Sequence, residues 1–278
     1  MAESKLLTYI PRESPVHRLC GATKLIVFLC WTIVCMLSYN TYVLLAAMAL
    51  GIAIFIIARI KLKEVSFALK LILIFILLND IAIFLFSPEE GCKIYGTRHE
   101  LFRLSPHFAV TQEQLFYTLN VSLKYFTVVP VALLFITTTN PSEFASSLTR
   151  IGCPYKISYA VAITLRYITD IQSDFVEISQ AQQARGVDLS RKAGLKKRVK
   201  GLAGIAVPLI FSSLDRIDLI SNAMDLRGFG KKNKRTWYAE KQFQKADYLV
   251  LIGTFLISAL ALYITFRNGS RFYNPFMK

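Results

Sequence analysis

The sequence predicts an all-α membrane protein with about five transmembrane helices and a further segment of long amphipathic helices. The chain has 278 residues, of which 54% are hydrophobic, and its mean hydropathy is +0.44, yet its formal net charge is +15. The apolar residues are concentrated in long runs that polar sequence separates. This composition is too apolar for a soluble domain and too charged for a chain embedded in lipid throughout, so we exclude a soluble enzyme.

The first apolar run, residues 25–58, is too long for one span, because a helix needs about 20 apolar residues to cross a bilayer. The sequence Ser38-Tyr39-Asn40 interrupts this run and predicts a tight turn between two short spans. Three later runs predict one span each: residues 65–86, 121–139 and 248–266. The run 121–139 is predicted to span the membrane despite Lys124 and Pro130 within it.

The runs divide the chain into three parts: an N-terminal membrane region with four spans (residues 1–139), a cytoplasmic domain (residues 140–246), and a C-terminal span with its tail (residues 247–278). Most of the 33 Lys and Arg residues lie in the N-terminal tail, in residues 59–70 and in the 140–246 segment. Positive charge favours the cytoplasmic face of a membrane, so we predict a cytoplasmic N-terminus and an external segment 87–120. This orientation explains the net charge without a nucleic-acid partner.

Two long helices are predicted within residues 140–246. The first covers residues 155–185 and becomes more polar toward its end. The second covers residues 202–227, where apolar residues recur every three or four positions and mark one face, and Pro208 should kink or start this helix. The basic residues within 191–200 predict a connector that faces solvent or lipid headgroups.

Both helices end with one shared pattern, which has a structural and a functional interpretation. The pattern occurs as Ser179-x-Ala181-x-x-x-Arg185-Gly186 and as Ser221-x-Ala223-x-x-x-Arg227-Gly228. A glycine just past a helix favours a left-handed C-cap, and an arginine in the last turn suits the negative end of the helix dipole. Alternatively, a helix tip presents each arginine to an acidic groove of another protein, because the planar guanidinium can bind a carboxylate in two places. The pattern alone leaves both interpretations open.

Several short motifs follow one another along the chain. They are Ser14-Pro15-Val16-His17-Arg18-Leu19, Thr23-Lys24-Leu25, Asn140-Pro141-Ser142-Glu143, Leu165-Arg166 and the two Arg-Gly endings. In this order and combination, the chain resembles the transmembrane T component (EcfT, CbiQ-like family) of energy-coupling factor (ECF) ABC transporters over nearly its whole length.

The resemblance implies an energy-coupling subunit of a micronutrient importer, for a vitamin or a metal, in the bacterial plasma membrane. Such a subunit combines membrane helices with a cytoplasmic coupling domain of long helices. Its partners are two ABC-type ATPase subunits, a substrate-binding S component and the lipid bilayer. The resemblance also implies that the subunit is not an enzyme, has no catalytic residue and binds no nucleotide. We also expect no cofactor and no metal site.

By the same resemblance, two motifs of the Ala-Arg-Gly type insert into grooves on the two ATPases. The first corresponds to Ala184-Arg185-Gly186. The second corresponds to Leu226-Arg227-Gly228, in which leucine replaces alanine. The identity of the transported substrate is not encoded in this chain, because in the family it is determined by the S component.

A membrane-embedded lipid-modifying enzyme is the main alternative. It would use the basic connector to hold phosphate headgroups and Asp170, Asp174 or Asp188 to hold a metal. These acids form no compact motif, and the two matching helix ends would have no role. The chain also lacks a G-x-x-x-x-G-K-[ST] loop, so we expect no ATP hydrolysis by this subunit.

An ion-conducting bundle is a third possibility, with Asn79, Asp80 and Lys124 as the main polar residues of the spans. These are too few for a continuous pathway, although Asp80 is by itself a functional candidate. The five cysteines include no C-x-x-C pair, and all three histidines lie outside the spans. Neither a zinc site nor a histidine-based intramembrane enzyme is therefore indicated.

Overall fold

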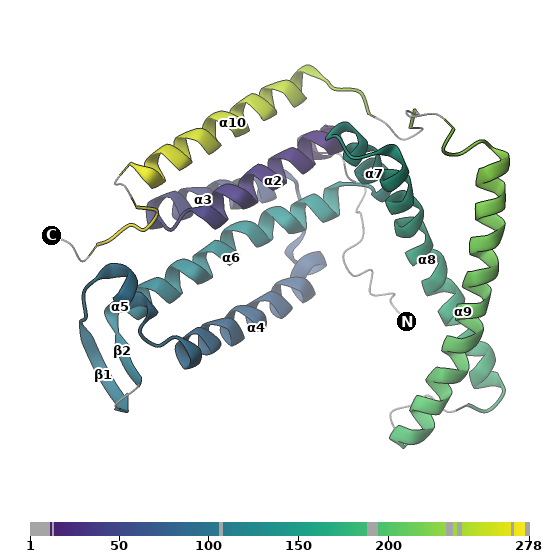
Figure 1. Ribbon diagram of the computed structural model, residues 1–278, viewed down its shortest axis with the longest axis horizontal. Coiled ribbons are helices and arrows are strands. Elements are labelled where there is room, and N and C mark those ends of the chain that lie inside the picture. Colours follow the sequence, from purple (N-terminus) through teal and green to yellow (C-terminus); the bar gives the residue numbers. More distant parts are fainter. Residues whose placement is uncertain are drawn as a thin grey trace. The chain divides into compact units, whose positions relative to one another are not determined.

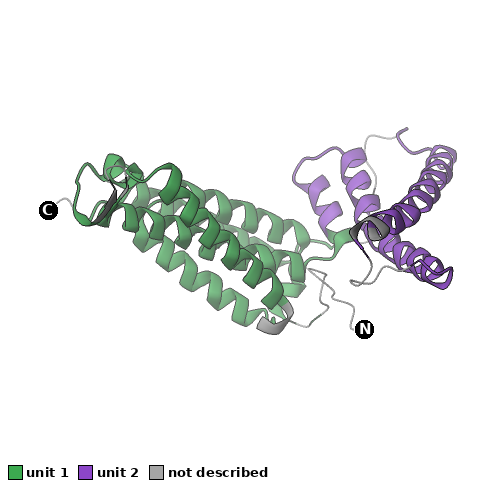
Figure 2. Ribbon diagram, turned by 90° about the horizontal axis from the view of Figure 1, so that it is seen from below, with its two compact units in different colours: residues 1–143, 241–278 green, residues 144–240 purple. Residues whose placement is uncertain are grey.

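The computed structural model consists of helices and one small β-hairpin, which confirms the predicted all-α fold class (Figure 1). It describes residues 12, 14–105, 108–187, 194–231, 236–237, 241–267 and 270–275. The chain divides into two compact units (Figure 2). Unit 1 contains residues 1–143 and 241–278, and unit 2 contains residues 144–240.

Unit 1 contains the apolar helices. In chain order its elements are α1 (Pro15–Arg18), α2 (Gly21–Leu37), α3 (Thr41–Ile57), α4 (Leu62–Phe86), α5 (Glu90–Tyr95), the antiparallel strands β1 (Glu100–Ser105) and β2 (Phe108–Thr111), α6 (Gln112–Thr138) and α10 (Lys245–Phe266). Helix α6 packs against α2, α3, α4 and α5, and α10 packs mainly along α2 (Figure 1). Helix α6 is therefore the central element of the unit.

Three of the described helices are long and apolar enough to cross a bilayer: residues Val65–Phe86 of α4, α6 and α10. Helices α2 and α3 are also apolar but have 17 residues each, which is near the lower limit for a crossing helix. The predicted break between them is confirmed, because α2 ends at Leu37 and Asn40 caps α3 by accepting a hydrogen bond from the Tyr42 N–H (3.1 Å). The chain is thus an all-α membrane protein, and a count of five spans depends on these two short helices.

Lys124 is buried in α6 and stabilises the end of α2. Its Nζ donates a hydrogen bond to the carbonyl oxygen of Met36, in the last turn of α2, at 2.7 Å. The same ammonium lies 3.1 Å from the ring centre of Tyr39, in the break that follows. Both contacts suit a cation, since the C-terminal end of a helix is negative and an aromatic face attracts positive charge. Lys124, which interrupts the apolar run 121–139, therefore stabilises the turn between α2 and α3.

The core of unit 1 lies where α2, α3 and α6 meet. One buried cluster consists of Trp31, Cys35, Leu44, Leu123 and Val131. The indole N–H of Trp31 donates to the carbonyl oxygen of Thr127 at 3.3 Å, so the ring is buried without an unsatisfied donor.

Unit 2 is built mainly from two long helices, α8 (Tyr155–Ala184) and α9 (Leu195–Leu226), and α7 (Pro141–Arg150) begins at the boundary between the units. The first predicted helix agrees with α8 to within one residue. The predicted start of the second helix is wrong, because α9 begins at Leu195, so part of the basic run 191–200 is helical and Pro208 lies inside the helix. Lysine and arginine are good helix formers, so a basic run does not end a helix. Residues 188–193 lie outside the described residues.

Candidate coupling site

The first predicted motif forms a Schellman C-cap at the end of α8. Gly186 has a left-handed backbone with φ of 86°, which a side chain would disfavour. The N–H of Val187 donates to the carbonyl oxygen of Gln182 (3.1 Å), and the N–H of Gly186 donates to that of Gln183 (2.9 Å). These two bonds satisfy carbonyl groups at the helix end and fix the position of Arg185, the C-cap residue.

The second predicted motif repeats this geometry at the end of α9. Gly228 has φ of 65°, the N–H of Phe229 donates to the carbonyl oxygen of Met224 (2.9 Å), and the N–H of Gly228 donates to that of Asp225 (2.9 Å). The backbone angles of Arg227, φ −81° and ψ 7°, nearly equal those of Arg185, φ −82° and ψ 8°. The two arginines therefore leave their helices in the same local geometry.

The side chains at both tips face solvent. Arg185 and Arg227 are exposed, as is Ala184. Leu226, which replaces the alanine at the second tip, is 90% exposed. The two tips therefore offer the same charged group but differ in the apolar group beside it.

Helices α8 and α9 pack against each other and run in opposite directions (Figure 1). Near the end of α8, Gln182 Nε2 donates to the carbonyl oxygen of Gly204 in the first part of α9 (3.4 Å). Farther from that end, the guanidinium of Arg216 donates to the carboxylate of Asp174 (2.9 Å). Later residues of α9 thus contact earlier residues of α8, so the two tips lie at opposite ends of the pair.

The second tip is anchored to the start of α8. Phe229, directly after Gly228, packs on Tyr155 and Tyr159, with ring centres 5.5 and 4.8 Å away. The first tip lies near Gly204, and a helix rises 1.5 Å per residue, so the remaining length of α9 separates the tips by about 33 Å. Two tips at this separation can contact two different protein surfaces.

The structure brings together residues of three motifs that carry the family resemblance. Ser14 caps α1, and its Oγ lies 2.7 Å from Nδ1 of the buried His17. Lys24 and Glu143, from two other motifs, are both buried in unit 1 and form an ion pair at 3.8 Å. Local sequence patterns give these residues no role and do not indicate Lys241, whose Nζ lies 3.1 Å from Oε2 of Glu143. A charged residue beside an apolar run, such as Lys24, was the one signal for this cluster.

Two of the polar residues named for the alternative functions, Asp174 and Asp80, have local partners. Asp174 pairs with Arg216, and in unit 1 the Ser122 hydroxyl donates to the Asp80 carboxylate at 2.8 Å. Within the described part of the chain, no three His, Cys, Asp or Glu side chains are grouped as metal ligands. Asp188 lies outside the described residues.

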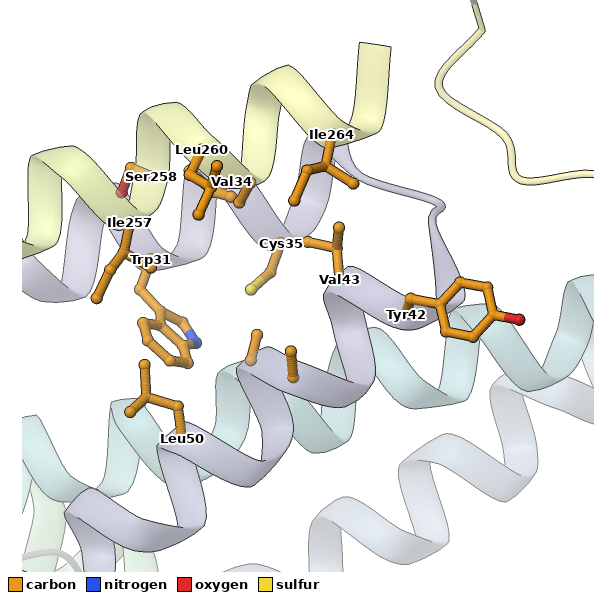
Figure 3. A pocket seen from close by; sticks show the side chains of 13 residues that line it. Trp31, Val34, Cys35, Tyr42, Val43, Leu50, Ile257, Ser258, Leu260 and Ile264 are labelled. Carbon is orange, nitrogen blue, oxygen red and sulfur yellow. The ribbon is translucent and has the colours of Figure 1, made fainter. Parts of the chain in front are cut away.

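An apolar pocket of about 260 Å³ lies among α2, α3 and α10 in unit 1 (Figure 3). Its lining includes Trp31, Leu50 and Ile264, and the hydroxyl of Tyr42 points away from the other labelled side chains (Figure 3). Its lining residues include no charged side chain, so the pocket offers hydrocarbon contact and no group that would orient an ionic ligand.

The fold and the paired helix ends define an all-α integral membrane protein with a separate unit of long helices. The chain belongs to the CbiQ family, whose model is described as "Cobalt transport protein" and matches residues 12–238. This confirms the family resemblance found in the sequence.

Curated relatives extend the match over almost the whole chain. The chain is 31% identical over 267 residues to the energy-coupling factor transporter transmembrane protein EcfT of Leuconostoc gelidum subsp. gasicomitatum, covering 90% of this chain and 93% of the relative. Its identity to the EcfT protein of Bacillus subtilis is 27%, covering 92% and 96%. Its identity to that of Heliobacterium modesticaldum is 30%, covering 91% and 95%. The chain is therefore similar in full length to transport proteins that are named as transmembrane components.

Proposed function

We propose that the chain is the energy-coupling transmembrane subunit of an ECF-type importer in the bacterial plasma membrane. It transmits a conformational change from two ABC-type ATPase subunits to a substrate-binding S component, and the substrate is a micronutrient, either a vitamin or a metal. The subunit itself catalyses no reaction and binds no nucleotide. Family membership and the names of the relatives support this proposal.

The observation that carries the proposal is the repeated geometry of the two helix tips. Arg185 and Arg227 are exposed, have nearly equal backbone angles and lie at opposite ends of α8 and α9. Two equivalent cationic tips suit two related partner subunits with acidic grooves. A guanidinium suits such grooves because its planar fork keeps its charge and binds carboxylates in two places.

The difference between the tips suggests that the two receiving grooves differ. Ala184 adds little apolar surface beside Arg185, whereas Leu226 is 90% exposed beside Arg227. Because Leu226 is so exposed, burying its side chain against a partner would make the free energy of binding more favourable. In this proposal, the groove for Leu226-Arg227-Gly228 has an apolar depression that the groove for Ala184-Arg185-Gly186 lacks.

The exposed apolar surface of α9 suggests where a further partner binds. Between residues 207 and 219 of this helix, six large apolar residues are each at least half exposed: Val207, Ile210, Phe211, Leu214, Ile217 and Leu219. Exposed apolar surface of this extent is typical of a contact with another protein or a membrane. We assign this surface of the proposed coupling domain, residues 140–246, to the S component.

The proposed orientation places the N-terminus and residues 140–246 in the cytoplasm. The high density of Lys and Arg in these segments supports it, because cytoplasmic loops of membrane proteins are enriched in positive charge. This orientation also puts both helix tips on the side of the membrane where ATP is available. The lipid-modifying alternative is less well supported, because the carboxylate of Asp174 is occupied by Arg216.

Copurification tests the proposed function. The chain, tagged and expressed from its native operon or genome, should copurify with two ABC-type ATPase subunits and with at least one small membrane protein that binds a micronutrient. The purified chain alone should show no ATP turnover, because it lacks a phosphate-binding loop of the G-x-x-x-x-G-K-[ST] type. Recovery of the intact chain without any ATPase, or ATP turnover that persists after contaminating ATPases are removed, would contradict the proposal.

A further inference from the structure

Glu143 and Lys241 mark the two positions where the chain passes between the units. Unit 1 includes residues up to Glu143 and resumes at Lys241, so the chain connects residues 144–240 to unit 1 at these two positions. Oε2 of Glu143 lies 3.1 Å from Nζ of Lys241. One ion pair therefore links the two connections, although they are far apart in the sequence.

Lys24 lies within ion-pair distance of the other oxygen of the same carboxylate. Its Nζ lies 3.8 Å from Oε1 of Glu143 and donates a hydrogen bond to the carbonyl oxygen of Thr138, at the end of α6, at 2.9 Å. The side chains of Lys24 and Glu143 are only 3% and 6% exposed. Burying a charge is costly unless an opposite charge and hydrogen bonds accompany it, so the two residues stabilise each other's position.

Neighbouring hydrogen bonds fix the starts of two membrane helices beside these ion pairs. Nζ of Lys241 also donates to the carbonyl oxygen of His17 (3.2 Å), just before α2. Asp247 is 1% exposed and accepts hydrogen bonds from the N–H groups of Cys20 (2.9 Å) and Gln244 (2.8 Å), which precede α2 and α10. The charged cluster thus contacts the starts of α2, α7 and α10 and the end of α6.

We propose that Lys24, Glu143 and Lys241 form a charge clasp that makes the two connections move as one body. The inference rests on the proposed coupling function. A displacement of residues 144–240 reaches the membrane helices by way of the two connections. When the clasp is closed, the displacement acts on the end of α6 and the start of α10 together. When it is open, each connection bends separately and less of the displacement is transmitted.

In this inference, Glu143 and Lys241 are positioning residues for coupling and do not contact the ATPases. A purely structural role would also explain their burial, but it would make assembly, ATP hydrolysis and transport fail together. A coupling role makes transport fail while assembly and ATP hydrolysis continue. The ratio of transport to hydrolysis therefore separates the two roles.

Lys241 is the member of the clasp best suited to mutation, because its side chain is 44% exposed. In Lys241→Glu, like charges face each other and open the clasp, while the new side chain can turn toward solvent. Lys241→Arg keeps the positive charge and should keep the clasp closed. Lys245→Glu is the matched control, since it makes the same change at an exposed position in the first turn of α10.

The first measurement uses the complete complex reconstituted in liposomes. For Lys241→Glu, we expect substrate uptake per ATP hydrolysed to fall at least about tenfold, with ATP hydrolysis within about twofold of wild type, because the buried Glu143 carboxylate has lost the nearer of its two cationic partners. Lys241→Arg and Lys245→Glu should both behave like wild type. Unchanged uptake by Lys241→Glu, or a parallel loss of uptake and hydrolysis, would overturn the inference.

The second measurement needs no partner subunit. Hydrogen exchange of the purified chain in detergent should become at least about tenfold faster in residues 142–146 and 244–248 of Lys241→Glu, because the opened clasp no longer holds the starts of α7 and α10 in place. Lys245→Glu should leave both segments unchanged. Unchanged exchange in Lys241→Glu would overturn the clasp even if the transporter assembles. By contrast, a wild-type chain that binds no ATPase would contradict the proposed function and would leave the exchange result as the test of the clasp.

Discussion

The double variant Arg185→Glu, Arg227→Glu is expected to lose binding to the ATPase subunits and to abolish transport, while its membrane insertion stays close to wild type. If each arginine enters an acidic groove, as proposed, each substitution removes a charge-assisted contact and places like charges together, which costs on the order of 2 to 5 kcal/mol for a buried interfacial pair. Folding should change little, because an arginine at a helix end contributes only about 0.3 to 1 kcal/mol through the helix dipole.

Pull-down of the ATPases and uptake of radiolabelled substrate measure this effect. Each single variant should be impaired, and the double variant should be the most impaired. Lys200→Glu is a suitable control, because Lys200 is exposed and lies near the start of α9, away from its tip. If the arginines serve only as helix caps, the double variant will assemble and transport like wild type, and the assignment of the tips will be wrong.

The variant Asp247→Ala is expected to give the largest loss of folding stability in unit 1. In the wild-type chain, the Asp247 carboxylate accepts hydrogen bonds from the N–H groups of Cys20 and Gln244, and Asp247 is 1% exposed. Removing it leaves two donors at the starts of α2 and α10 without this acceptor, and each such donor costs about 1 to 3 kcal/mol when it stays buried. Because Cys20 is buried whereas Gln244 is exposed, the free energy of unfolding should fall by about 1 to 3 kcal/mol, mainly through the Cys20 N–H.

Thermal unfolding of the detergent-solubilised chain, followed by size-exclusion chromatography, measures this loss. Asp247→Asn retains one acceptor oxygen and should show an intermediate decrease in the unfolding midpoint. Asp218→Ala removes an exposed carboxylate from α9 and should unfold at nearly the wild-type temperature. Equal midpoints for Asp247→Ala and Asp218→Ala would show that the Asp247 hydrogen bonds do not stabilise the fold.

The features that sequence reasoning predicted well depend on local signals. Gly186 and Gly228 determine the two helix ends, because a left-handed residue after a helix is strongly favoured as glycine. Long apolar runs similarly predict α4 and α10, and the polar break after Leu37 predicts the separation of α2 from α3. These conclusions need no knowledge of tertiary contacts.

The elements that sequence reasoning missed have weaker or conflicting local signals. Helix α7 is short and polar, so neither apolar periodicity nor length indicates it, although Asn140 caps its first turn and Pro141 occupies its first position. The start of α9 lies in a basic run that charge alone assigns to a connector. The hairpin between α5 and α6 depends on pairing between strands, which a single sequence specifies poorly.

The charge clasp could not be predicted from the sequence because its members come from distant segments. Lys24 and Glu143 belong to recognisable motifs, but nothing local indicates that both are buried or that Lys241 is their partner. Because Lys24 and Glu143 are buried, the loss of one charge leaves the other without a compensating charge at a large cost in free energy. Only the folded structure shows this dependence.

Site-specific photo-crosslinking at the two helix tips tests most directly the central claim that each tip contacts an ATPase. A photoreactive amino acid replaces Arg185 or Arg227, one at a time, in cells that express the whole transporter. We expect each position to crosslink to an ABC-type ATPase subunit, and the same probe at Lys93, which the proposed orientation places outside the cell, should not. Failure of both tip positions to crosslink to an ATPase in an assembled, transport-competent complex would contradict the claim.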